Sequence, residues 1–241
     1  KNIAVVYNGE IYNYQENREY LEAKGHKFYT HSDTETIVHL YEELGDKCVE
    51  RLRGMFAFAL WDSKNERLIL ARDRIGIKPL YYYFKDGVLV FASEIKSLLV
   101  YPGISREFNY NALHDYLTYM YVPAPDTIFN GIYKLLPGHL LVCENANIFI
   151  KQYWDINNDY NYKELPRYDE NELSAQLLKL MKESVKMHLI SDVPLGVFLS
   201  GGTDSGSIVA LATEISGKPV KTFSIGFEDD YHNELDSARI T

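Results

Sequence analysis

The fold of the second half of the chain follows from one stretch, Gly196-Val197-Phe198-Leu199-Ser200-Gly201-Gly202-Thr203-Asp204-Ser205. A short apolar run leads there into two glycines and then into the start of a helix. The apolar pattern predicts a buried strand over 195–199, a helix over 205–215 and a second buried strand over 220–226. A strand, a helix and a strand at this spacing form a parallel pair with a right-handed crossover. With an amphipathic helix over 172–189 before it, the stretch predicts the start of an α/β, doubly wound parallel-sheet domain.

The two glycines of this stretch have two interpretations. Glycines let the backbone approach a phosphate closely, and the free N–H groups of the first helical turn attract negative charge. The alternative is a plain strand-to-helix turn that needs glycine for its geometry and Ser205 as the helix cap. The loop chemistry alone leaves both open. No lysine follows the glycines and their spacing is not GxGxxG, which excludes two familiar nucleotide-binding motifs.

The residues before about 155 predict a different architecture. Strand patterns joined by short turns indicate three hairpins: 55–62 with 67–72, 80–84 with 88–92, and 140–143 with 148–151. A further strand is expected over 3–7, and helices are expected over 15–24 and 34–44. Hairpins imply antiparallel sheets with helices layered on them. We therefore expect an α+β domain over 1–155, a polar linker over 156–167 and the parallel-sheet domain over 168–241.

Composition limits the classes of partner. The formal net charge is −9 and the pI is about 5.3, which leaves no broad basic face for nucleic acid or an anionic membrane. The longest apolar run, 55–61, is far too short to span a bilayer. Only two cysteines occur, Cys48 and Cys143, which favours a reducing compartment, the cytoplasm. Because Lys1 leads directly into a strand pattern and 238–241 read as a helix start, we expect the natural protein to extend beyond both ends.

Five stretches of the first domain carry a specific pattern: Asn8-Gly9-Glu10-Ile11-Tyr12-Asn13, Ser32-Asp33-Thr34-Glu35, Gly54-Met55-Phe56-Ala57-Phe58-Ala59, Arg72-Asp73-Arg74-Ile75-Gly76-Ile77-Lys78-Pro79-Leu80-Tyr81 and Ala92-Ser93-Glu94-Ile95-Lys96. In this order and spacing they resemble the class II glutamine amidotransferase domain of B-type, glutamine-hydrolysing asparagine synthetases. That domain has an N-terminal-nucleophile hydrolase fold. The loop of form SGG-x-DS is similar to the pyrophosphate loop of the ATP-pyrophosphatase domain of the same enzymes, with Thr203 in place of a usual Leu and Gly206 in place of a common Ser. The resemblance covers nearly the whole chain.

For the first domain, the resemblance implies a glutamine site. The side-chain amide of Asn8 and the backbone N–H of Gly9 would form an oxyanion hole, and Glu10 and Asp33 would hold the amino group of glutamine. Each residue also has a structural interpretation from the sequence. Asn8-Gly9 reads as a plain turn after a strand, Glu10 as a solvated surface acid, and Asp33 as part of a helix cap in which Ser32 and Glu35 form a capping box.

For the second domain, the resemblance implies a nucleotide site. The loop residues Ser200, Gly201, Gly202, Thr203, Asp204 and Ser205 would cradle the pyrophosphate of ATP, with Leu199 and Ile225 flanking the adenosine. Asp204 would hold Mg²⁺, since a carboxylate facing a polyphosphate requires a cation between them. The alternative is that Asp204 only favours the positive end of the following helix.

The implied reaction has glutamine, aspartate and ATP as small-molecule substrates. Ammonia released from glutamine would convert an aspartyl-adenylate to asparagine, with release of AMP and pyrophosphate, in an enzyme that forms a homodimer. The implied nucleophile is an N-terminal cysteine, whereas residue 1 is Lys. Cys48 and Cys143 read as small core residues. Either the cysteine precedes this sequence or the glutaminase has been lost, as in the related β-lactam synthetases. Amidation of another carboxylate, lactam formation and a non-catalytic homologue also stay open.

Overall fold

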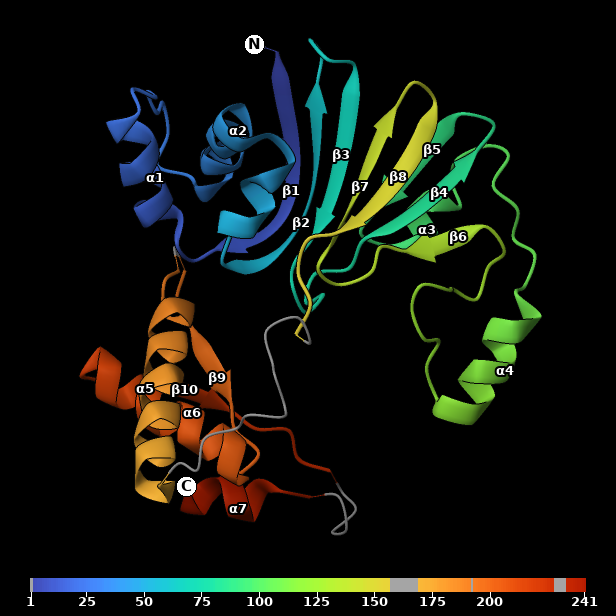
Figure 1. Ribbon diagram of the computed structural model, residues 1–241. Coiled ribbons are helices and arrows are strands. Elements are labelled where there is room, and N and C mark those ends of the chain that lie inside the picture. The colour runs from blue at the N-terminus through green and yellow to red at the C-terminus, as the bar shows by residue number, and fades with distance from the viewer. Residues whose placement is uncertain (1, 157–168, 192, 228–232) are drawn as a thin grey trace. The chain divides into compact units, whose positions relative to one another are not determined.

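The computed structural model describes residues 2–156, 169–191, 193–227 and 233–241 (Figure 1). The chain divides into two compact units, Lys1–Tyr160 and Asn161–Thr241. The linker expected over 156–167 lies, apart from residue 156, outside the described residues. Across the described part of the chain, every helix is too short or too polar to cross a membrane.

The first unit is built on a five-stranded sheet that is antiparallel throughout (Figure 1). Its strand order is β1 (Ile3–Ile11), β2 (Gly54–Asp62), β3 (Arg67–Arg72), β7 (His139–Glu144) and β8 (Asn147–Gln152). A second antiparallel sheet has the order β5 (Val88–Ala92), β4 (Tyr81–Lys85) and β6 (Ile132–Lys134). The three predicted hairpins and the antiparallel α+β class of this unit are confirmed.

Side-chain alternation along β2 assigns the two faces of the larger sheet. Phe56, Phe58 and Leu60 pack in a core with the helices α1 (Tyr14–Ala23) and α2 (Asp33–Leu44) and the 3₁₀ helix η1 (Gly45–Arg51). Ala57 and Ala59 pack in a separate core with residues of the smaller sheet. The larger sheet is therefore the middle layer, with helices on one face and the smaller sheet on the other. Two short helices, α3 (Ile95–Leu98) and α4 (Tyr110–Tyr119), complete this unit.

Strand β1 is longer than the sequence suggested. It continues through Asn8, Gly9 and Glu10 to Ile11, so the interpretation of Asn8-Gly9 as a turn is wrong. The physical reason lies on the neighbouring strand. A Cβ on Gly9, whose φ is +155°, would lie 2.1 Å from the Met55 carbonyl oxygen, and a Cβ on Gly54 would lie 2.0 Å from the Glu10 carbonyl oxygen. Glycine is needed at both positions because β1 and β2 approach each other so closely.

The second unit contains α5 (Glu170–His188), β9 (Gly196–Phe198), α6 (Thr203–Ser216), β10 (Lys221–Phe223) and α7 (Leu235–Ile240). Strands β9 and β10 are parallel, which confirms the predicted strand–helix–strand unit. The strands are shorter than predicted and are not buried: the side chains of Phe198 and Phe223 are 76% and 56% exposed, because no element among the described residues covers them. The last helix begins at Leu235 and not at residue 238.

Candidate functional site

Asn8 lies where two of the sequence stretches meet. It is exposed on β1 opposite Ala57 and lines a cavity of about 230 Å³ between the two sheets of the first unit. Ser93, which directly follows β5, lines the same cavity and accepts a hydrogen bond from Asn8 Nδ2 at 3.4 Å. A bond of this length is weak, so the amide can turn to another acceptor at little cost.

Glu10 is half-buried on β1, so the interpretation of Glu10 as a solvated surface acid is wrong. Burial, followed by the charge of Glu10, raises the pKa of the neighbouring Tyr12 phenol. Strand alternation places Glu10 on the same face as Asn8, toward the smaller sheet. Tyr7 and Ile11 point to the opposite face, and both pack in the core shared with the helices.

Asp33 joins α2 to β1. Its Oδ2 accepts hydrogen bonds from the Tyr7 hydroxyl at 2.7 Å and from the Ile11 N–H at 2.9 Å. Among the described residues, its Oδ1 makes only long contacts of 3.4 Å, with the hydroxyls of Ser32 and Thr34. One carboxylate oxygen is therefore used by the fold, and the other remains open to a ligand.

The predicted capping box is wrong. Ser32 is the N-cap of α2, but its Oγ accepts from the Thr34 N–H. The Glu35 carboxylate does not return to Ser32; it accepts from the backbone N–H groups of Tyr29 and Thr30 and from the Thr30 hydroxyl. Asp33 is the first helical residue, and its carboxylate bonds to a strand. The Glu35 side chain, which a capping box requires, is thus bound to the loop before α2.

The Tyr7 phenol donates to Asp33 and is close enough to Glu10 for the charge of Glu10 to act on it. Tyr7 was not singled out from the sequence, where a tyrosine in a strand pattern carries no functional signal. Burial raises the pKa of the Tyr7 phenol, and the hydrogen bond and charge of Asp33 and the charge of Glu10 raise it further. The phenol therefore stays protonated and donates to Asp33. The charges of Glu10 and Asp33 thus both act on the Tyr7 phenol. Asp33 bonds to Tyr7 on the helix-side face of β1, whereas strand alternation places Glu10 on the face of Asn8.

Neither cysteine is suited to nucleophilic attack. Cys48 is 2% exposed in η1 and packs in the helix-side core, which confirms it as a core residue. Burial raises the pKa of its thiol to about 12. Cys143 is half-buried on β7, and burial raises the pKa of its thiol as well. Since the thiolate is the reactive form, both side chains are inert near neutral pH.

The glycine-rich loop of the second unit ends in an open helix start. The N-cap of α6 is Gly202, so Ser205 lies inside the first turn, and the interpretation of Ser205 as the cap is wrong. The hydroxyls of Ser200 and Ser205 are 3.0 Å apart, and the Ser200 N–H donates to Ser205 Oγ at 3.3 Å. Among the described residues, no side chain accepts from the N–H groups of Thr203, Asp204 or Ser205. These donors remain available to an anion.

The two glycines of the loop differ in their surroundings and in their backbone conformation. Gly201 has φ +82°, and a Cβ there would lie 2.4 Å from the Ser237 carbonyl carbon of α7. Packing and conformation therefore account for Gly201. A Cβ on Gly202 would meet nothing closer than Ser200 Oγ at 3.6 Å, and its φ of −76° suits any residue. The space beside Gly202 is open to a ligand.

A cavity of about 430 Å³ lies beside this loop, at the carboxyl ends of β9 and β10. Leu199, which is nearly buried, and Ile225, which is 67% exposed, both line it, together with Ser200 and Ser205. The Ser224 hydroxyl donates to the Leu199 carbonyl at 2.6 Å and ties the two strand ends together. Two of the loop residues, Ser200 and Ser205, and the two apolar residues expected to flank the adenosine thus border one space. Asp204 is exposed on the helix start and does not line it.

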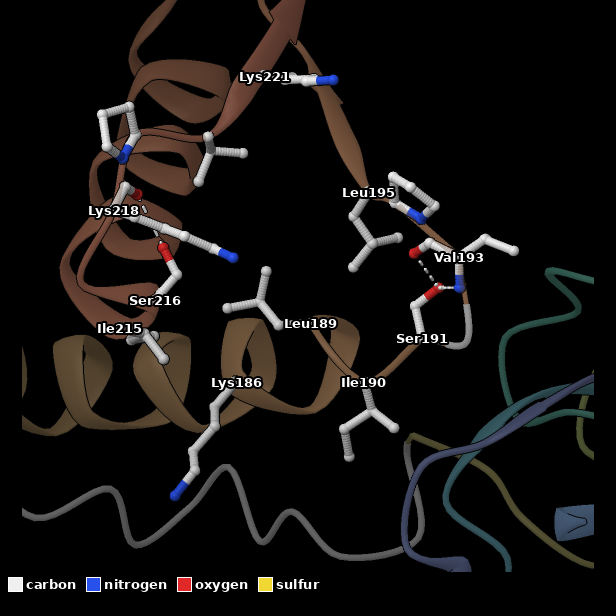
Figure 2. A pocket seen from close by; sticks show the side chains of 13 residues that line it. Lys186, Leu189, Ile190, Ser191, Val193, Leu195, Ile215, Ser216, Lys218 and Lys221 are labelled. Carbon is white, nitrogen blue, oxygen red and sulfur yellow. Dashed lines mark hydrogen bonds between the residues drawn. The ribbon is translucent and has the colours of Figure 1, made fainter. Parts of the chain in front are cut away.

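A larger cavity, about 590 Å³, lies at the opposite end of the strands (Figure 2). Figure 2 shows its walls: the end of α5 with Leu189, the segment with Ser191 and Val193, and the segment after α6 with Ser216 and Lys218. None of the residues to which the sequence assigned a site role lines it. Because ligands of open α/β sheets bind at the carboxyl ends of the strands, we take the smaller cavity beside the loop as the candidate nucleotide site.

Comparisons with known proteins match two families in succession along the chain. The family described as "Glutamine amidotransferase domain" matches residues 1–154, and the family described as "Asparagine synthase" matches residues 176–241. The chain is 41% identical over 238 residues to asparagine synthetase [glutamine-hydrolyzing] 1 of Bacillus subtilis, covering 98% of this chain and 37% of that protein. It is 38% identical over 231 residues to asparagine synthetase [glutamine-hydrolyzing] 3 of the same organism, covering 94% of this chain and 37% of that protein. Among solved structures, it is similar to the glutamine phosphoribosylpyrophosphate amidotransferase of B. subtilis complexed with ADP and GMP, with 19% identity and a TM-score of 0.46, covering 95% of this chain and 47% of that chain.

The chain belongs to the glutamine amidotransferase domain family, whose model matches well over half of it. The second match and the two B. subtilis relatives confirm the predicted resemblance to the glutamine-hydrolysing asparagine synthetases. The chain spans 37% of the length of each of these relatives.

Proposed function

We propose that this chain is part of a carbon–nitrogen ligase that makes asparagine from aspartate with ammonia released from glutamine, at the expense of ATP. The observation that carries the proposal is the succession of two matched families in one chain, amidotransferase over 1–154 and asparagine synthase over 176–241. Within it we propose a glutaminase domain over 1–155, a linker over 156–167 and the start of the synthetase domain from 168. We also propose that the full-length protein is a homodimer in the cytoplasm.

In the glutaminase domain, we assign the oxyanion hole to the Asn8 side-chain amide and the Gly9 N–H. Donors fixed toward a developing oxyanion are a large catalytic contribution in acyl transfer. The weak contact of Asn8 with Ser93 supports this role, because the amide can turn from Ser93 to an oxyanion at little cost. Glu10 and the open oxygen of Asp33 would receive the ammonium group of glutamine.

The nucleophile of this proposal is a thiol from outside the present sequence. Cys48 and Cys143 are unsuited because burial keeps both thiols protonated. Attack by the thiol on the glutamine carboxamide would give a thioester and release ammonia, and water would then release glutamate. The rival account, a homologue that has lost its glutaminase, requires Asn8, Glu10 and Asp33 to serve the fold alone.

In the synthetase domain, we assign ATP to the cavity beside the loop. The open N–H groups of the first turn of α6, the hydroxyls of Ser200 and Ser205 and the free space at Gly202 would hold the pyrophosphate. Thr203 would contribute its N–H. Adenosine would lie between Leu199 and Ile225.

Asp204 would hold Mg²⁺, whose charge would offset that of the polyphosphate. An exposed carboxylate at the helix start, without a hydrogen bond or ion pair among the described residues, fits a hard divalent cation. Transfer of AMP to the aspartate side chain makes its carboxyl oxygen a good leaving group, which ammonia displaces. The same loop and chemistry also suit a relative that amidates another carboxylate or closes a lactam.

The full-length protein should form asparagine, AMP and pyrophosphate in equal amounts when given glutamine, aspartate and ATP. Replacing glutamine by ammonium chloride should preserve the reaction, because ammonia is the species that reaches the second site. Product analysis by mass spectrometry, with other small carboxylates offered in place of aspartate, measures this. Pyrophosphate release that depends on a different carboxylate would contradict the asparagine assignment, and the absence of any such release would favour the non-catalytic homologue.

The substitution Asp33→Asn in the full-length protein should raise the KM for glutamine by about 10–100-fold, the loss of a charge-assisted contact worth about 1.5–3 kcal/mol. Steady-state glutaminase kinetics and a thermal melt of each variant measure this. The matched control is Tyr7→Phe, which removes the phenol that Asp33 accepts from but keeps the carboxylate. It should lower stability and leave the glutamine KM nearly unchanged. If both variants lose stability and neither changes the KM, Asp33 serves only to join α2 to β1.

A further inference from the structure

Two histidines and three carboxylates lie close together between the segment after α1 and one side of α2, in a region that the proposed reactions do not use. His26 follows α1, and its N–H bonds to the Leu21 carbonyl at 3.1 Å. His39 and Glu42 are three residues apart on α2 and therefore share one face of the helix. Both imidazole side chains are only 14% exposed, and Phe28 packs edge-on against His39.

The ligand atoms of this cluster have the spacing of a coordination shell. The Nδ1 atoms of His26 and His39 are 3.0 Å apart. Glu42 Oε2 lies 3.0 Å from His39 Nδ1 and 3.5 Å from His26 Nδ1. Ligand atoms bound at 2.0–2.2 Å to a tetrahedral zinc lie about 3.3–3.5 Å from one another, so an ion fits among the three with only small shifts.

The second nitrogen of each ring faces a carboxylate. His26 Nε2 lies 3.0 Å from Glu43 Oε1, and His39 Nε2 lies 3.6 Å from Glu35 Oε1. Metal-binding histidines characteristically donate their other N–H to a carboxylate, which fixes the tautomer and orients the ring. Glu43 is in turn held by Lys24 Nζ at 2.7 Å, and Glu35 by the backbone N–H groups of Tyr29 and Thr30.

Proton counting favours a cation in this cluster. Two neutral imidazoles carry two N–H groups, whereas three carboxylates face them. If both N–H groups point to Glu35 and Glu43, two bare Nδ1 atoms and the Glu42 carboxylate are left facing one another, which is repulsive. A metal ion among these three atoms satisfies every contact with both rings neutral. Without a metal, one of the two neutral rings must carry its proton on Nδ1, which leaves the carboxylate beside its Nε2 without that donor.

We propose that His26, His39 and Glu42 form a binding site for a divalent transition-metal ion of the zinc type, with an open fourth position for water. Imidazole nitrogen with one carboxylate is a donor set suited to zinc and its neighbours and poorly suited to Mg²⁺. The site would clamp the segment after α1 to α2, independently of the proposed reactions.

The test is a titration of the purified, chelator-treated protein with zinc chloride, followed by calorimetry and by thermal melting. One zinc ion per chain should bind, and the melting temperature should rise with zinc concentration. Cobalt(II) in place of zinc should give the visible absorption of a four-coordinate ion. Affinity should fall steeply as the pH drops below about 6, because protons compete for the two imidazoles.

Three variants decide the outcome. His39→Gln and Glu42→Gln should each lower the zinc affinity at least about 10-fold; the Glu42 side chain is 45% exposed, so the second variant keeps the fold if the first does not. The control is His114→Gln, which removes an imidazole that is 82% exposed on α4 and should bind zinc as the unaltered protein does. Failure of the unaltered protein to bind zinc, or affinity unchanged in Glu42→Gln, overturns the proposal and leaves a proton-sharing histidine pair.

Discussion

Asn8→Ala in the full-length protein should lower the rate constant of glutamine hydrolysis by about 10²–10³-fold, the usual loss when an oxyanion donor is removed. The loss should fall on kcat more than on KM, since the donor stabilises charge that develops only in the transition state. Stability should change little, because the Asn8 side chain is exposed and its bond to Ser93 is long. Steady-state kinetics with glutamate detection, beside a thermal melt, measures both quantities.

Two further variants separate the oxyanion role from a general effect on the sheet. Asn147→Ala removes another exposed amide, at the start of β8, and should hydrolyse glutamine at the parental rate. Ser93→Ala removes the acceptor that orients Asn8 and should give a smaller loss than Asn8→Ala. Ammonia-dependent asparagine formation should survive in all three proteins. A parental glutaminase rate in Asn8→Ala would remove this side chain from the proposed oxyanion hole.

The parts of the fold that the sequence predicted are those with local causes. The turn between β4 and β5 is an example: Asp86 and Gly87 take positive φ values of 50° and 77°, as an Asp-Gly hairpin turn requires. The order of β9, α6 and β10 likewise follows from an apolar run, two glycines and a helical pattern in succession. In these segments a few neighbouring residues decide the conformation, so inspection of the sequence is enough.

The wrong interpretations of the sequence concern residues whose role depends on contacts with residues far away in the chain. Asn8-Gly9 has the composition of a turn, but Gly9 is needed because β2 lies close to it, and β2 begins 45 residues later in the sequence at Gly54. Asp33 reads as a cap, but its carboxylate bonds to Tyr7 and Ile11, which are 26 and 22 residues away. Helix α4 was not predicted, and of its ten residues only Ala112 is buried.

The candidate sites follow the same division. The loop Ser200–Ser205 could be found from the sequence, since its glycines and hydroxyls are adjacent and open the helix that positions them. The cavity that Asn8 shares with Ser93 could not, because it requires residues 85 positions apart to meet. The histidine cluster joins side chains 13 positions apart across two elements. The spacing of residues along a single helix or strand does not predict such a cluster.

Asp204→Asn in the full-length protein should abolish Mg²⁺-dependent, aspartate-driven release of pyrophosphate. The carboxylate lies in the first turn of α6, exposed and without a hydrogen bond or ion pair among the described residues. Next to a polyphosphate it would repel the substrate, unless a cation lies between them. Carboxylate and phosphate oxygens are the ligands that Mg²⁺ prefers. Glutamine hydrolysis in the other domain should continue in this variant, so that glutamate forms without asparagine.

The alternative is that Asp204 only stabilises the helix by its charge near the N-terminus, which contributes about 0.3–1 kcal/mol at an exposed site. Asp236→Asn is the matched control, because Asp236 is also an exposed aspartate in the first turn of a helix, α7, and is 91% exposed in its pair with Arg239. Both variants should lose a similar, small amount of stability. Only Asp204→Asn should lose pyrophosphate release, measured over a range of Mg²⁺ concentrations. If Asp204→Asn releases pyrophosphate at the parental rate and with the parental Mg²⁺ dependence, Asp204 is a helix-end residue and other side chains hold the metal.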